Sequence, residues 1–146
     1  NGAVTLGTLD GANVEIHDAV GDENMFLFGM TAEEVEELWR RGYNPMEYIN
    51  RDPQLKAVVD MLMNGIGGNR FDDILYSLLQ GGNAPADAYM SMADFTDYVR
   101  AQNDVTAAYA DRRGFAKRSL VNIAKAGVFS ADRAVREYAE NIWKLV

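Results

Sequence analysis

The chain of 146 residues contains no cysteine. This absence excludes disulfide bridges, thiolate metal sites and a cysteine nucleophile. No apolar run approaches the roughly 18 residues that a membrane-spanning helix needs, and no signal peptide is recognisable. We therefore expect a soluble, cytoplasmic protein without a membrane partner.

Positive charge is scarce. The 14 Lys and Arg residues are outnumbered by 22 Asp and Glu residues, which gives a formal net charge of −8. Nucleic-acid phosphates are bound by a basic patch, whereas the cations here are scattered in short groups such as Arg112-Arg113 and Lys117-Arg118. We therefore expect no nucleic-acid partner.

Histidine occurs once, at position 17. A catalytic histidine needs a nucleophile or a substrate within hydrogen-bond reach, and the sequence identifies neither beside His17. We interpret it as an exposed or capping residue. The acidic run at residues 33–37 is typical of a capped, solvated helix face, so we expect no metal site there.

The first thirty residues predict a strand–helix–strand unit. Apolar runs at Ala3–Leu9 and Met25–Phe28 predict two buried strands, and residues 12–20 predict a short helix between them. Strands buried on both faces belong mostly to parallel sheets covered by helices, and two strands alone do not make a stable sheet. The predicted class is therefore α/β, with a partial, Rossmann-like parallel sheet that other strands complete.

Residues 31–146 predict mainly helices. Thr31 with Glu34 forms a capping-box pattern, and Asn44-Pro45 and Asp52-Pro53 are further helix starts. Residues 88–93 predict a short strand or extended segment, after which Asp94 caps a helix. Ser130 is the predicted cap of the last helix, whose Trp143 needs a partner surface in this chain or in a longer parent protein.

The turn after the first strand carries the candidate site residues. Glycines at 7 and 11 allow close backbone approach, and a helix N-terminus attracts anions, so the turn fits a phosphate cradle. Asp10 places a carboxylate at that position, which favours the alternative of a helix cap. Asp10, Asn13 and Glu15 also fit a polar network beneath an active site.

Several motifs resemble those of one enzyme family. The first residues read NGAVTLGTLDGANVEI and are followed by ENMFLFG. Later segments read ADF with YV at 93–99, SLVNIA at 119–124, FSADR at 129–133 and REYA with IW at 136–143. Together and in this order they resemble the glycogen and starch phosphorylases, the α-glucan (maltodextrin) phosphorylase family.

The resemblance implies that residues 1–146 are one fragment, the C-terminal part of the C-terminal domain of a phosphorylase. Such an enzyme releases glucose 1-phosphate from α-1,4-glucan ends by phosphorolysis and uses pyridoxal phosphate. The family's cofactor lysine belongs to a segment just upstream of Asn1. The resemblance therefore implies no catalytic, cofactor-binding or metal-binding residue in this chain, and a structural fragment that is inactive alone.

Partners follow from the same resemblance. The remainder of the phosphorylase chain is the expected partner, and glucan and phosphate are bound through that parent. The alternative is a stand-alone helical module, derived from a phosphorylase, that binds other proteins. The unpaired edge of the strand at residues 3–9 also predicts self-association.

Overall fold

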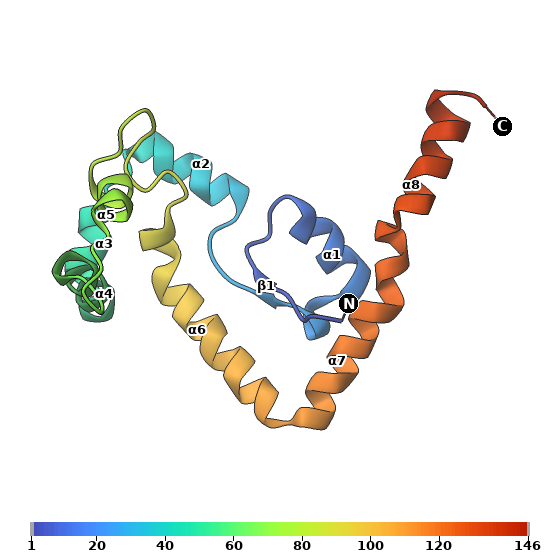
Figure 1. Cartoon of the computed structure of the whole chain (residues 1–146), viewed down its shortest axis with the longest axis horizontal. Coiled ribbons are helices and arrows are strands. Elements are labelled where there is room, and N and C mark those ends of the chain that lie inside the picture. Colours follow the sequence, from blue (N-terminus) through green and yellow to red (C-terminus); the bar gives the residue numbers. More distant parts are fainter. Residues whose placement is uncertain (1, 146) are drawn as a thin grey trace.

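The computed structural model describes residues 2–145 and is mostly helical (Figure 1). Figure 1 shows the long helices α6 and α7 as the two sides of a V, with β1 and α1 between them. Helices α2 to α5 gather near the start of α6. The elements are β1 (Leu6–Gly7), α1 (Ala12–Val20), η1 (Asp22–Asn24), β2 (Phe26–Leu27), α2 (Ala32–Arg41), α3 (Pro45–Arg51), α4 (Pro53–Asn64), α5 (Asp72–Leu79), α6 (Ser91–Ala110), α7 (Arg112–Lys125), η2 (Ala126–Phe129), α8 (Ala131–Glu137) and η3 (Tyr138–Ile142).

The strand–helix–strand start is confirmed. β1 and β2 are parallel, with Leu6 opposite Phe26 and Gly7 opposite Leu27. The strands are shorter than predicted, and their residues are half-buried, where burial on both faces was expected. The ladder ends after Phe28, which donates to the Gly7 carbonyl, because the next amide on that side, Met30, donates to Asp94 instead of to the first strand.

Most of the predicted helix starts are confirmed. The Thr31 hydroxyl accepts from the Glu34 amide while the Glu34 carboxylate accepts from the Thr31 amide, which completes the capping box. Asn44 accepts from the Met46 amide, and Asp52 accepts from the amides at 54 and 55. These side chains satisfy backbone donors that a helix N-terminus leaves unpaired.

One predicted cap is wrong and another is confirmed in position only. Gly11, not Asp10, is the N-cap residue of α1, and no side chain bonds its free amides. The Asp10 carboxylate instead accepts from the Thr8 hydroxyl at 3.0 Å. Ser130 does occupy the N-cap position of α8, but its hydroxyl makes no capping hydrogen bond.

The prediction for residues 88–93 is also wrong. Residues 86–89 form turns and α6 already begins at Ser91, so Asp94 lies inside the helix. Asp87 takes the capping role: its carboxylate accepts from the amides of Ser91 and Met92 at 2.9 and 2.8 Å. It also accepts from the Tyr43 hydroxyl at 2.6 Å, and these three donors allow a carboxylate to be buried.

The main core lies where α3, α4 and α5 meet the start of α6. Ile49, Leu55, Val59 and Met92 are buried together. The apolar side chains of α4 are only partly covered, since Val58 is 40% exposed. The core is therefore local to one end of the molecule and does not extend under the sheet.

The last helical segment points away from the rest of the molecule (Figure 1). We call residues 131–145 the C-terminal arm. It contacts η2, its neighbour in sequence, and Trp143 packs on Tyr138 of the same arm with ring centroids 5.8 Å apart. Trp143 is 56% exposed, so its indole does not dock on another part of residues 2–145.

Candidate functional site

Two chain segments leave the parallel strands at the same edge. Residues 8–10 follow β1 and residues 28–30 follow β2. In open α/β sheets, ligands bind in the crevice at the carboxyl ends of the strands. A cavity of about 650 Å³ opens here, with mainly apolar walls from both strand ends and from α4 and α6. Its polar lining includes Thr8, Asp10, Ser91 and Asp94.

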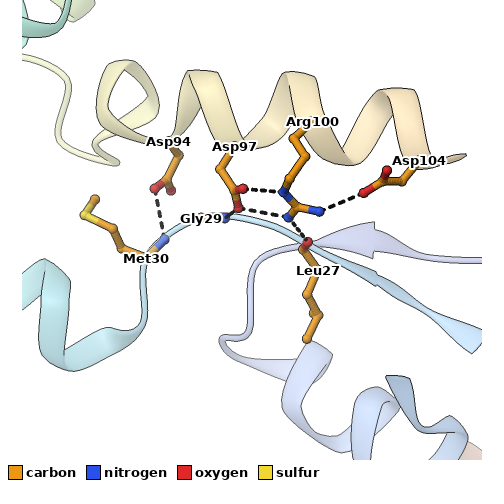
Figure 2. A network of polar contacts seen from close by, with 7 residues as sticks. All are labelled: Leu27, Gly29, Met30, Asp94, Asp97, Arg100 and Asp104. Carbon is orange, nitrogen blue, oxygen red and sulfur yellow. Dashed lines mark hydrogen bonds and ion pairs between the residues drawn. The ribbon is translucent and has the colours of Figure 1, made fainter. Parts of the chain in front are cut away.

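Helix α6 holds the segment that follows β2 (Figure 2). The Gly29 amide donates to Asp97 at 2.8 Å and the Met30 amide donates to Asp94 at 3.0 Å. Arg100 donates to the Leu27 carbonyl at 3.0 Å. We call Asp94, Asp97 and Arg100 the strand clamp, because they bind the backbone from across 64 to 73 residues of sequence.

Arg100 also organises the clamp itself. Its guanidinium donates to Asp97 at 2.6 Å and to Asp104 at 2.8 Å, as Figure 2 shows. These pairs are three and four residues apart on one helix, where side chains are neighbours. The Arg100 guanidinium thus positions the Asp97 carboxylate to accept from the Gly29 amide, and it also donates to the Leu27 carbonyl.

Gly29 is required by the clamp's geometry. Its φ is +83°, and a Cβ built on it would lie 2.6 Å from an Asp94 carboxylate oxygen. The left-handed backbone costs any other residue strain, and the contact leaves no space for a side chain. The close approach brings two successive backbone amides, at 29 and 30, within reach of two carboxylates.

The two clamp carboxylates have opposite pKa shifts. Burial raises the pKa of Asp94, the negative charges of Asp97, Asp87 and Glu34 raise it further, and the Met30 amide lowers it. The hydrogen bond from Arg100 lowers the pKa of Asp97, with the Gly29 amide acting in the same direction. Asp94 is therefore the clamp residue that holds a proton more readily, on the wall of the cavity.

The structure brings together two of the three predicted site residues. Asp10 accepts from the Thr8 hydroxyl, and the Asn13 amide donates to the Thr8 carbonyl at 2.9 Å. Asp10 and Asn13 are thus joined through Thr8 at the edge of the cavity. The Asn13 side chain also packs on Gly7, where a Cβ would lie 2.6 Å from the amide nitrogen.

Glu15 and His17 lie apart from this group. Glu15 lines a separate hollow with Lys125 and Arg133. The His17 Nε2 is 2.5 Å from a carboxylate oxygen of Asp22, whose side chain is 88% exposed. The single histidine therefore takes part in a surface contact, and no hydroxyl nucleophile is paired with it within residues 2–145.

Comparisons with known proteins identify the family. A family model described as carbohydrate phosphorylase matches residues 1–145. Over 145 residues, 99% of this chain, it is 48% identical to glycogen phosphorylase of Synechocystis sp. and 46% identical to that of Haemophilus influenzae. It is 41% identical over 147 residues, covering 98% of this chain, to the muscle form of human glycogen phosphorylase. The chain belongs to the carbohydrate phosphorylase family.

This member of the carbohydrate phosphorylase family spans only part of its relatives. The matched region is 17% of the Synechocystis and human proteins and 18% of the Haemophilus protein. The strand clamp and the cavity therefore belong to a segment that is about one sixth as long as these relatives. Among the described residues, no helix combines the length and the apolar character needed to cross a bilayer.

Lysines and metal ligands are not gathered at the cavity in the described part of this chain. Lys56 pairs with Asp60 on α4, Lys117 and Lys125 lie on α7, and Lys144 follows η3. The lining of the cavity contains no Lys, Arg or His. Across residues 2–145, no three His, Asp or Glu side chains are placed to hold a metal ion.

Sequence reasoning missed the strand clamp. Its residues at 94, 97 and 100, with the Arg100 partner at 104, repeat every three or four positions, so they share one face of a helix. That spacing predicts a charged face on the helix. It does not tell which backbone the face meets, because the partner segment lies far away in the sequence.

Proposed function

We propose that this chain is the C-terminal part of an α-1,4-glucan phosphorylase, which releases glucose 1-phosphate from glucan ends with pyridoxal phosphate. The observation that carries the proposal is the match of residues 1–145 to the family, together with relatives named glycogen phosphorylase along almost all of this chain. Glucan and phosphate are then bound by the complete enzyme, which works in the cytoplasm.

The residues of this chain do not fit the cofactor. A pyridoxal phosphate site needs a lysine amine and groups that balance a phosphate. The cavity at the strand ends offers Asp10 and Asp94 and no cation, so its walls oppose a phosphate. We infer that the cofactor lysine and its phosphate ligands lie in another part of the parent, and that the chain is inactive alone.

The role of the chain in the parent is to build and hold the sheet. The strand clamp fixes the backbone after β2, and Asn122 of α7 donates to the Asn24 carbonyl just before β2. Asp10 and Asn13 fix the turn after β1 through Thr8. Positioning groups of this kind matter in enzymes because small displacements of an active site lower its rate strongly.

The C-terminal arm supplies the surface on which the remainder of the enzyme docks. Ile142 and Trp143 are 65% and 56% exposed, although both are large apolar side chains. Exposed apolar groups that share one element mark an interaction surface. The alternative, a stand-alone interaction module, uses the same arm for a different protein.

A paired assay tests the proposal. The chain is mixed with pyridoxal phosphate, glucan and phosphate, and cofactor absorbance and glucose 1-phosphate are measured, with and without the co-expressed remainder of a homologous phosphorylase. We expect no signal from the chain alone and both signals from the pair. Gly29→Ala should abolish activity of the pair, whereas Gly127→Ala, where a Cβ meets nothing within 4 Å, is the matched control.

Cofactor binding or turnover by the chain alone would contradict the proposal that the chain is inactive alone. A pair that assembles but gives neither signal would contradict the proposal that the parent is an α-1,4-glucan phosphorylase. A fluorescent fusion of the complete enzyme tests its location, for which we expect a diffuse cytoplasmic signal. Recovery of an unrelated protein on the arm, with no affinity for the phosphorylase remainder, would favour the interaction module.

A further inference from the structure

Two exposed tyrosines flank the loop between α5 and α6. Tyr89 is 93% exposed and Tyr76 is 52% exposed. Tyr89 is not part of a loose loop, since it sits in the turn that Asp87 fixes through its bonds to the Ser91 and Met92 amides. An ordered turn therefore presents an aromatic ring to solvent.

Both tyrosines line a hollow of about 420 Å³. The loop at residues 81–85 also lines it, and the Tyr76 ring packs on Gly82, where a Cβ would lie 3.1 Å from the ring. We call this region the tyrosine hollow; it is lined by Tyr76, Gly82, Asn83, Pro85, Tyr89 and Ser91.

The tyrosine hollow is polar but carries no free charge. Its single ionisable acid, Asp87, is already occupied by Tyr43 and by two backbone amides. No Lys, Arg or His lines it. In the described part of the chain, the Asn83 amide and the Ser91 hydroxyl have no protein partner, so they remain available as donors and acceptors.

This chemistry selects a neutral polyhydroxylated ring. A sugar ring presents C–H groups that pack on an aromatic face, and hydroxyls that bond to an amide and a hydroxyl. Aromatic side chains combine a large apolar face with a polar end, which suits such an amphipathic ligand. A phosphate or a carboxylate finds no cation in the hollow, so anionic ligands are disfavoured.

We propose that the tyrosine hollow is a surface site for a glucan chain, adjacent to the cavity at the strand ends, with which it shares Tyr89 and Ser91. The choice of an α-1,4-glucan rests on the proposed function, whereas the choice of a neutral sugar rests on the hollow itself. A second point of attachment on a polymeric substrate raises the local concentration of its ends at the enzyme.

Titration of the isotopically labelled chain with maltoheptaose tests this site by NMR. We expect millimolar binding, with shifts of the Gly81 and Gly82 amides, which the loop holds against Tyr76 and Ala84 carbonyls. Tyr89→Ala should weaken binding about three- to tenfold, the range of one aromatic contact, and Tyr89→Phe should retain it. Tyr138→Ala removes another exposed tyrosine, on the C-terminal arm, and should change nothing.

The proposal would be overturned if maltoheptaose caused no NMR shifts in the loop at residues 81–85. It would also be overturned if Tyr89→Ala and Tyr138→Ala changed the affinity for maltoheptaose equally. Because Tyr89 is almost fully exposed, its replacement leaves the fold intact, and Asn83→Ala provides a second variant in the same hollow. The paired assay described above separates the two proposals. An inactive pair with maltoheptaose binding retained refutes only the enzymatic function, and an active pair without these shifts refutes only the tyrosine hollow.

Discussion

The body of the molecule, residues 2–110, and the C-terminal arm use their polar groups differently. In the body, polar side chains join segments far apart in sequence, as when Asp97 binds the Gly29 amide and Thr96 binds Asp52. In the arm, Arg133 pairs with Glu137 four residues away. The body therefore specifies its own tertiary structure, whereas the arm specifies only a helix and leaves its apolar side chains for another surface.

The largest loss of stability is expected from a substitution at Gly29 in the body. Gly29→Ala forces a Cβ to within 2.6 Å of Asp94 at a φ of +83°, so it combines steric overlap with backbone strain. We expect a loss of about 3 kcal/mol in the free energy of unfolding. Urea denaturation measures it, with Gly127→Ala next to the arm as the reference. Equal stabilities for the two variants would show that the clamp does not hold the sheet.

A smaller loss is expected at Asp87. Asp87→Ala leaves the Tyr43 hydroxyl and two helix amides without their acceptor in a buried place. Unsatisfied buried donors cost about 1–3 kcal/mol, so we expect about 2 kcal/mol. Asp132→Ala, in the first turn of the exposed helix α8, is the matched change in the arm and should cost less than about 0.5 kcal/mol. Thermal unfolding of both variants gives the comparison.

The clamp carboxylates predict opposite responses to pH. The pKa of Asp97 lies below its usual value of 3.8, so its stabilising effect is complete above 3.8 and is lost as pH falls through the lowered pKa. The pKa of Asp94 is raised, so its ionisation removes stability as pH rises from 3.8 through the raised pKa.

Asn substitutions separate these two effects in denaturation series from acid to neutral pH. Asp97→Asn should destabilise the chain more at neutral pH than in acid. Asp94→Asn, which keeps an acceptor for the Met30 amide, should become relatively more favourable as pH rises. The same pH dependence in both variants would contradict the assignment of opposite shifts.

The smallest effect on stability is expected in the arm. Trp143→Ala removes an indole that is 56% exposed, so the isolated chain should change by less than about 0.5 kcal/mol. Its association with the co-expressed phosphorylase remainder should weaken about tenfold or more, because buried aromatic anchors dominate interfaces. Pull-down titration measures this. Unchanged association would mean that the arm's indole is not part of the docking surface.

Local signals in the sequence predicted the helices well. The Thr31 capping box and the starts at Pro45 and Pro53 depend on residues within one turn of each other, so the sequence contains the whole interaction. Asp94 was misassigned as a cap because the choice between Asp87 and Asp94 depends on Tyr43, which lies 44 residues before Asp87. A linear pattern does not contain that contact.

The candidate site was predicted in part. Asp10 and Asn13 were expected to form a polar network, and they do meet, through Thr8. Glu15 was grouped with them by proximity in sequence, but on α1 it faces the hollow that contains Lys125. Strand lengths were overestimated because the apolar runs were matched to a complete sheet, whereas β1 and β2 here pair only with each other.

The contact between the Ser119 hydroxyl and the Gly2 carbonyl also bears on the order of events during synthesis. The two residues are separated by 117 positions, and Asn122 reaches Asn24 across 98. At translation speeds of about 5–20 residues per second, the first strand waits roughly 6–23 s on the ribosome for α7 to emerge. The backbone around the first strand thus stays uncovered by α7 until 117 further residues have been made.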